Sequence, residues 1–394
     1  MVMRIALTTT TLLLSLLPAC GDAYRSLLAG TKTPTVRVRL GRVRPTGRIR
    51  IDDQGWRAMS LSGRRFSATG SRTFETTVTV GADGIRFQGR DTGSDLLVLE
   101  ASTAFELDGV SYSGALRIRR QAGQLEFVNE LDMETYVAGV IGNEVGPNGA
   151  DSAYRAQAVT ARTYAYKRIS ANGANEKAFH LFDSAASQVY RGRSPRYGVS
   201  YTRMERETRK TRGVILMWNA RPLTAYYSST CGGHTTDCAT SRLDPAGGDE
   251  ALRGVPCRWC KTSKYYSWPD VVRTDDDVVT GFKRIKRPIT LPVHGIEISE
   301  RGRGGWARTV KVTYGPKRKT RELPGPEFRS AMKLRSHNIQ TVRRFSGGFK
   351  FSGKGWGHGV GMCQWGAREM GKAGANESEI LRYYYPGSTL EKLY

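Results

Sequence analysis

Glu144 is the only carboxylate in the stretch VIGNEVGPNGA, residues 140–150. Glycine and proline surround it, and these residues end helices and leave the backbone uncovered by side chains. A bulky substrate can reach an acid held on so thin a corner. Burial against apolar helix ends would raise its pKa and suit it to general acid catalysis. The alternative interpretation is an incidental loop acid between two core helices.

Two pairs of metal-binding residues follow further along the chain. Cys231 and His234 form a C-x2-H pair, and Cys257 and Cys260 form a C-x2-C pair. Each spacing can bend two ligands onto one ion, so the four residues predict a tetrahedral zinc site. Four protein ligands leave no position open for water, so this zinc would be structural. Two disulfide bonds are the alternative, which an exported location favours, and Cys238 is left over as a substitute ligand.

The glycine-rich stretch GKGWGHGVGMCQWGA covers residues 353–367. Its glycines let backbone amides lie against a ligand or a neighbouring strand, but it lacks the Lys-Ser/Thr end of a phosphate-binding loop. We expect Trp356, His358 and Gln364 to form a polar and aromatic surface that binds sugar rings. Two interpretations of Cys363 stay open: a thiol nucleophile with His358 as its base, or a small buried hydrophobe.

A helical hairpin must position Glu144. Asp132 can cap a first helix whose apolar residues recur at helical spacing; these are Met133, Tyr136, Val137, Val140 and Ile141. We expect Gly142 and the GPNG run, residues 146–149, to end this helix. A second helix is expected from Asp151 or Ser152, with a face of small residues that lets another element approach closely.

The second helix carries three residues that could position a sugar or Glu144 itself. They are Arg162, Thr163 and Tyr164. For Arg162 an ordinary buried salt bridge is the alternative, and the sequence favours neither interpretation over the other.

Short runs of alternating apolar and polar residues, such as TVRVRL and TTVTV, predict strands before the hairpin, and RTVKVTY and FKFSG predict strands after it. The expected fold class is therefore α+β, with β-rich lobes flanking a helical hairpin core that carries the active-site groove. The predicted parts are a signal peptide (1–19), a linker (20–34), a β-rich part (35–128), the core with the Cys/His cluster (129–269), a β-rich insertion (270–350) and the glycine-rich motif with C-terminal helices (351–394).

The formal net charge is +25, from 61 basic and 36 acidic residues, and a surface this basic attracts polyanions. The N-terminal sequence indicates in which compartment, and therefore with which polyanion, the protein acts. Arg4 precedes a short apolar run, as in a secretory signal, and LLPAC resembles a lipobox that would attach Cys20 to a membrane lipid. We therefore expect an exported protein of the cell envelope or periplasm, with an anionic wall polymer rather than nucleic acid as its partner.

Three stretches in the same order resemble the stage II sporulation protein D family, which includes the LytB amidase enhancers. They are VNELDMETYVAGVIGNEVGPNGADSAYRAQAVTARTYAYKR, YYSSTCGGHT and GHGVGMCQWGA with EILRYYYPG. The resemblance runs from about residue 35 to residue 394. It implies a peptidoglycan lytic transglycosylase that cleaves peptide-stripped glycan strands and leaves 1,6-anhydro-muramic ends, with Glu144 matching the catalytic acid. A non-catalytic glycan-binding amidase enhancer, with a cell-wall amidase as its partner, is the alternative.

A single carboxylate fits the implied reaction. Ordinary glycosidases use two, one to protonate the leaving oxygen and one as base or nucleophile. In a lytic transglycosylase the C6 hydroxyl of the sugar itself attacks the anomeric carbon, so its effective concentration is already high. One Glu can protonate the glycosidic oxygen and then accept the hydroxyl proton.

Overall fold

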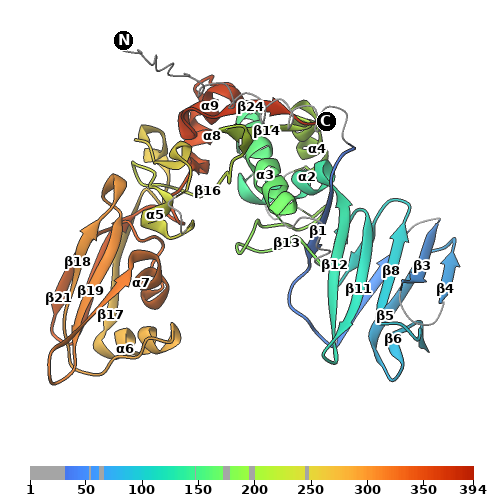
Figure 1. The fold of residues 1–394 in the computed structure, drawn as a ribbon, viewed down its shortest axis with the longest axis horizontal. Coiled ribbons are helices and arrows are strands. Elements are labelled where there is room, and N and C mark those ends of the chain that lie inside the picture. Colours follow the sequence, from blue (N-terminus) through green and yellow to red (C-terminus); the bar gives the residue numbers. More distant parts are fainter. Residues whose placement is uncertain are drawn as a thin grey trace, which may run out of the picture.

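The computed structural model describes residues 32–52, 55–61, 66–146, 148–171, 178–194, 200–244 and 248–394. Two β-rich lobes extend from a helical centre, so that the whole molecule has the outline of an arch (Figure 1). The expected α+β class is confirmed. The predicted signal peptide and Cys20 lie outside the described residues. Within the described ranges, no helix is both long and apolar enough to cross a membrane.

The first lobe consists of two sheets that share one apolar core. Their strand orders are β13-β1-β12-β11-β8-β3-β4 and β10-β9-β2-β5-β6-β7. Buried and exposed residues alternate along these strands because successive side chains point to opposite faces of a sheet. The strands are β1 (Thr35–Arg39), β2 (Thr46–Ile51), β3 (Trp56–Ser60), β4 (Ser67–Gly70), β5 (Phe74–Gly81), β6 (Gly84–Phe87), β7 (Arg90–Asp91), β8 (Leu96–Ala101), β9 (Phe105–Leu107), β10 (Val110–Tyr112), β11 (Ala115–Gln121), β12 (Gln124–Asp132) and β13 (Leu181–Phe182).

The helical centre begins with the predicted hairpin, α2 (Met133–Glu144) and α3 (Asp151–Ala171). Asp132 caps α2 as expected, accepting hydrogen bonds from the amides of the first turn. Helix α2 does not end at Gly142, because Val145 still donates to the carbonyl of Ile141 at 3.1 Å. The chain leaves the helix only at Gly146, where φ is +77°. Glu144 is therefore the last residue of a helix and not a loop residue.

Further short elements surround the hairpin. One of them, α4, has a mostly charged sequence and packs on both hairpin helices through a narrow buried face. The elements are α4 (Tyr201–Lys210), β14 (Val214–Trp218), β15 (Arg221–Pro222), β16 (Tyr227–Ser228), α5 (Cys238–Ser241), η1 (Glu250–Leu252), η2 (Arg258–Thr262), β23 (Met362–Cys363), α8 (Gln364–Lys372), α9 (Glu377–Tyr384) and β24 (Thr389–Lys392). Strands β16 and β23 pair in parallel, which brings the glycine-rich motif beside the segment that follows the hairpin.

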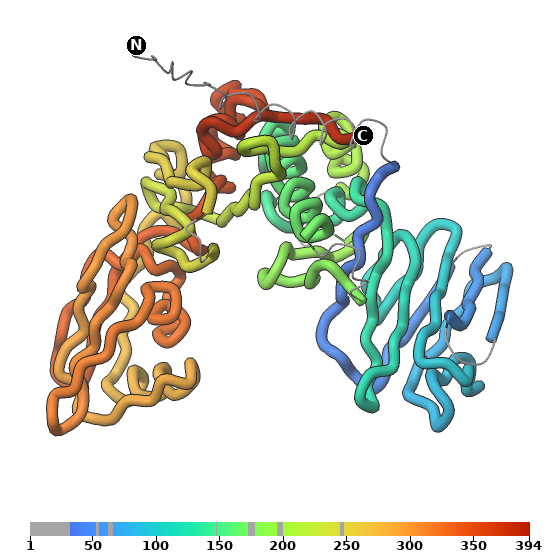
Figure 2. Tube along the Cα trace, in the orientation of Figure 1, coloured from blue at the N-terminus to red at the C-terminus, as the bar shows by residue number. Residues whose placement is uncertain are grey.

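The second lobe leaves the centre after η2 and returns before the glycine-rich motif, as Figure 2 shows along the chain. It was expected to be β-like, and it contains two helices as well. Its elements are β17 (Ser267–Thr274), α6 (Asp275–Arg284), β18 (Val293–Arg301), η3 (Arg303–Gly305), β19 (Ala307–Tyr314), β20 (Lys319–Pro324), α7 (Gly325–Met332), β21 (Ile339–Phe345) and β22 (Gly348–Lys354). Two three-stranded sheets and these helices enclose a separate apolar core.

Candidate functional site

Glu144 faces a cavity of about 450 Å³ in the helical centre. Segments far apart in the chain line it: the ends of α2 and α3, residues 185–189, residues 226–229 and the glycine-rich motif. Helix α7 of the second lobe also contributes, through Arg329. A volume of this order is typical of ligand sites. Among the described residues that line the cavity, Glu144 is the only one with a carboxylate.

The Glu144 carboxyl is half-buried and held by two donors. Its Oε1 accepts from the Val189 amide at 2.9 Å, and its Oε2 accepts from Nε2 of Gln364 at 3.1 Å. Burial raises the pKa of Glu144, and the hydrogen bonds from Val189, Gln364 and Tyr227 only partly oppose that effect. The carboxyl also lies at the C-terminal end of α2, where the helix dipole disfavours a negative charge. The site therefore makes Glu144 hold its proton to a higher pH than an exposed carboxyl would.

Tyr227 links this acid to a buried hydrogen-bond network that the sequence did not predict. Nε2 of Gln188 donates to the Tyr227 hydroxyl at 2.9 Å, and the Tyr136 hydroxyl donates to Oε1 of Gln188 at 3.0 Å. Tyr136 belongs to α2 and Gln188 immediately precedes Val189, so the network fixes the loop whose amide holds Glu144. In the sequence, only the paired tyrosines at 226–227 pointed to this hydrogen-bond network.

The structure brings Trp356, His358 and Gln364 to the cavity together. Trp356 is 38% exposed, and its ring packs edge-on against Tyr265 with centroids 4.2 Å apart. Gly357 has a φ of +111°, and a Cβ there would lie 2.9 Å from the Cβ of Ser228. Glycine is therefore required where the motif passes close to the neighbouring strand.

His358 is held by backbone groups. Its Nδ1 accepts from the Val360 amide at 3.1 Å. Burial, and then the charge of Arg329, lower the pKa of His358 to about 4. The ring is therefore neutral at pH 7, and it serves as a polar wall of the cavity.

Two residues from α3 have different surroundings. Tyr164 lines the cavity, and its hydroxyl accepts from Arg168 at 3.1 Å. Arg162 is fully buried away from the cavity and forms a bidentate pair with Glu134 at 2.8 and 2.6 Å. Its guanidinium also donates to the carbonyl of Val214 at 3.0 Å. Of the two interpretations of Arg162, the structure agrees with the buried salt bridge. This salt bridge joins the two hairpin helices.

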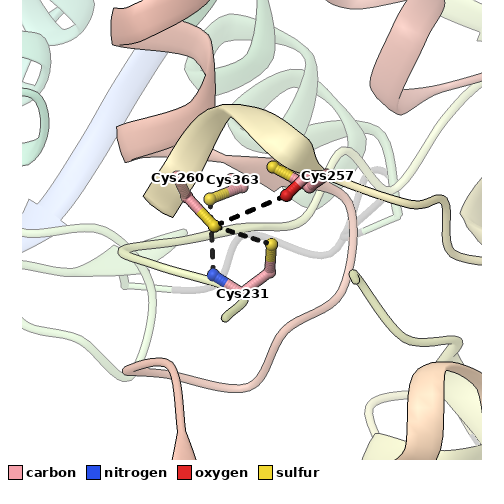
Figure 3. A group of neighbouring side chains, drawn as sticks. All are labelled: Cys231, Cys257, Cys260 and Cys363. Atoms are coloured by element: carbon pink, nitrogen blue, oxygen red, sulfur yellow. Dashed lines mark hydrogen bonds between the residues drawn. The ribbon is translucent and has the colours of Figure 1, made fainter. Parts of the chain in front are cut away.

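Four cysteines meet beside the cavity, as Figure 3 shows: Cys231, Cys257, Cys260 and Cys363. Their sulfur atoms all lie within 4.8 Å of one another, and all four side chains have 0% exposure. We call this group the four-cysteine cluster. The Cys231 and Cys260 sulfurs are 3.5 Å apart, and the Cys231 amide donates to the Cys363 sulfur at 3.3 Å. Cys363 is therefore buried, as one of the two interpretations expected, and its sulfur lies among three other thiols.

The prediction of His234 as a metal ligand is wrong. Its backbone forms an isolated β-bridge with Pro256, and its Nδ1 contacts the carbonyl of Thr235. His234 is not among the residues whose ligand atoms group together, although the C-x2-H spacing alone would allow ligation. Cys363, from the glycine-rich motif, takes the fourth position instead. Cys238 is buried elsewhere, and burial raises the pKa of its thiol to about 12.

The donor set of the four-cysteine cluster fits a zinc ion. Zinc–sulfur bonds of about 2.3 Å in a tetrahedron put the sulfurs about 3.8 Å apart, which agrees with the observed grouping. Hydrogen bonds from the Cys231, Cys257 and Cys363 thiols lower the pKa of Cys260. None of the five described cysteines forms a disulfide bond. A buried four-cysteine cluster that could hold a metal ion is thus present.

Comparisons with known proteins place these features in a family. The family model described as "SpoIID: Stage II sporulation protein" matches residues 121–218, which include Glu144 and both hairpin helices. The chain is 32% identical over 300 residues to an uncharacterized protein of Brachyspira hyodysenteriae, covering 74% of this chain and 75% of that protein. It is 28% identical over 278 residues to stage II sporulation protein D of Bacillus subtilis, covering 67% and 76%. It is also 28% identical over 293 residues to an amidase enhancer of Bacillus subtilis, covering 64% of this chain and 40% of that protein.

Proposed function

The chain belongs to the stage II sporulation protein D family, which has a cell-wall-related role, and from this membership and the Glu144 cavity we propose that it is a peptidoglycan lytic transglycosylase. Its substrate is the peptide-stripped glycan strand. The observation that carries the proposal is a lone carboxyl of raised pKa in a cavity lined by aromatic and polar side chains. Such a site suits a reaction that needs one acid and no activated water.

The reaction breaks the bond between C1 of a muramyl residue and O4 of the next sugar. Protonated Glu144 donates its proton to O4 as this oxygen leaves. The muramyl C6 hydroxyl attacks C1, and the new C1–O6 bond gives the 1,6-anhydro product. The hydroxyl proton passes to the Glu144 carboxylate, which the Val189 and Gln364 donors stabilise while it is charged. The acid is then protonated again for the next cleavage.

The cavity walls supply binding groups for the sugars. Trp356 offers an exposed ring face, and Tyr164 and Gln364 offer polar groups near the acid. Aromatic rings bind the apolar faces of sugars, and amide and hydroxyl groups bind their hydroxyls. The neutral His358 ring adds a hydrogen-bonding wall without a competing charge.

The test is the mass of the products that the purified protein alone releases from peptide-free glycan strands. We expect 1,6-anhydro-muramic ends from the wild type, and a loss of about 10² to 10⁴ in rate for Glu144→Gln, as for other general acids. Glu297→Gln is the matched control, because that carboxyl is 64% exposed on strand β18 of the second lobe. Full activity of Glu144→Gln, or hydrolytic ends in place of anhydro ends, would refute the proposal.

The name of one relative, an amidase enhancer, supports a second candidate function for this chain. In this case the same cavity holds a glycan strand without cleaving it, and the bound protein stimulates a cell-wall amidase. The two functions separate cleanly, since Glu144→Gln would abolish cleavage yet leave stimulation of the amidase unchanged.

The proposed partner lies in the cell envelope, which agrees with the net charge of +25 and with a predicted export signal at residues 1–19. Attachment to the membrane through a lipid on Cys20 remains part of this proposal. Radiolabelled palmitate incorporated by the wild type and absent from Cys20→Ser would support it.

We further propose that the four-cysteine cluster holds a structural zinc ion through Cys231, Cys257, Cys260 and Cys363. Bound zinc would supply cross-linking and no catalytic step, since four thiolates close its coordination shell. It would tie the segment after β16, the turn η2 and the start of α8 into one unit. Gln364, which follows Cys363 directly, would thereby be fixed against Glu144.

A further inference from the structure

Two arginines face the Glu144 cavity from different parts of the chain. Arg168 lies near the end of α3, and Arg329 lies on α7 of the second lobe. Helix α7 is on the side of that lobe that faces the helical centre (Figure 1). The lining of the cavity thus includes two guanidinium groups from different parts of the chain together with the Glu144 carboxyl.

Neither arginine forms an ion pair with a carboxylate of the described ranges. Arg168 donates to the Tyr164 hydroxyl at 3.1 Å and lies 5.2 Å from the centroid of that ring. Arg329 donates from Nε to the carbonyl of Leu334 at 3.3 Å. By contrast, Arg155 and Arg162, both on α3, are each paired with glutamates. The two cavity arginines therefore keep guanidinium donors available for a ligand.

The charge in the cavity is unbalanced. Burial lowers the pKa of Arg329, and this shift has no opposing contribution from an acidic neighbour. The charge of Arg329 in turn helps to lower the pKa of His358. Burial raises the pKa of Glu144, so this carboxyl ionises less readily than an exposed one. A partly buried cation without a counter-charge is costly, so the cavity suits a ligand that brings an anion.

The proposed substrate carries such an anion only after its peptide has been removed. Each muramyl residue bears a lactyl ether, whose carboxyl is a free carboxylate in stripped strands and an amide where the peptide is attached. We propose that Arg168 and Arg329 bind the lactyl carboxylates of peptide-free muramyl residues, and that this contact selects stripped strands over peptide-bearing ones. The inference rests on the proposed function and names the feature of the substrate that the cavity recognises. Guanidinium groups suit this role because their planar donors match a carboxylate.

The experiment compares two ligands that differ only in this charge. One is the peptide-free glycan strand, and the other is the same strand with its lactyl carboxyls converted to methylamides. Binding to the full chain is measured by calorimetry in the Glu144→Gln background, which removes cleavage. We expect the acid strand to bind about tenfold more tightly, the size expected of a charge-assisted contact.

Substitutions assign the preference to the two arginines. Arg329→Met and Arg168→Met should each reduce the preference for the acid strand severalfold. Binding of the methylamide strand by each variant shows that it folds. Arg329→Lys should retain part of the preference. Arg343→Met removes the same charge from an exposed position on β21 of the second lobe and should retain all of it.

The outcomes separate the inference from the proposed function. Equal binding of the two strands would overturn the inference and leave glycan binding intact. A preference that survives both methionine variants, or that Arg343→Met removes equally, would also overturn it. If neither strand binds, both the inference and the proposed function fail.

Discussion

The Glu144 site and the four-cysteine cluster are neighbouring groups of titratable side chains with opposite relations to solvent. Glu144 is half-buried and faces a cavity of about 450 Å³, whereas the four thiols have 0% exposure and face one another. The acid is held by donors that leave room for a substrate. The thiols are grouped closely enough to hold one metal ion. The helical centre thus combines one group that faces a cavity with another that is closed to solvent.

The largest expected effect comes from removing one thiol of the four-cysteine cluster. Cys363→Ser should lower the zinc content of protein purified without reducing agent from about one ion per chain to nearly none. It should also strongly destabilise the helical centre, because the apparent binding energy of structural zinc is about 10 kcal/mol or more in small domains. Cys238→Ser is the matched control, since Cys238 is equally buried but lies outside the cluster. A Cys363→Ser protein with full zinc content would contradict the assignment.

A smaller effect concerns the pH dependence of the activity that the Glu144 site is proposed to have. The proposed reaction needs protonated Glu144, so activity should fall as pH rises through a pKa above the ordinary 4.5. The hydrogen bond from Gln364 lowers that pKa, and Gln364→Leu removes it. The alkaline limb of kcat against pH should therefore move to higher pH in Gln364→Leu. A limb that does not move, or moves to lower pH, would show that another group controls it.

The smallest effect is on stability. Because burial raises the folded-state pKa of Glu144 above its unfolded value, the folded protein binds the proton more tightly, and its stability falls as pH rises through the folded-state pKa. Glu144→Gln has no such charge to bury. The variant should therefore have a slightly higher Tm than the wild type at neutral pH, and the difference should shrink towards pH 4. A Tm difference that is independent of pH would exclude this cause.

Local signals predicted the hairpin well. The Asp132 cap, the helical spacing of the apolar residues and the glycine-rich corner together located Glu144 between two packed helices. Helix α2 continues past Gly142 to Glu144 and ends just before the GPNG run, because Gly142 is compatible with a helix once tertiary packing supports the last turn. The charged α4 gave no apolar signal, since its buried face is narrow.

Long-range assembly limited the prediction of the sites. Cys363 joins the four-cysteine cluster through the pairing of β23 with β16, and no spacing in the sequence reveals that pairing. His234 satisfied a familiar ligand spacing, but the structure groups Cys363 with the other three cysteines instead. Arg329 reaches the cavity from a lobe with its own core, so its contribution depends on how that lobe is placed.

The second lobe is attached to the centre at positions close to two thiols. Strand β17 begins soon after Cys260, and β22 ends shortly before Cys363. Both crossings of the backbone therefore lie close in sequence to cluster residues, and Trp306 of the lobe also contacts the centre, donating from Nε1 to the carbonyl of His234 at 2.9 Å. Asn338 of the lobe donates to the carbonyl of Cys231 at 3.3 Å, so the junction that places Arg329 at the cavity also contacts the four-cysteine cluster.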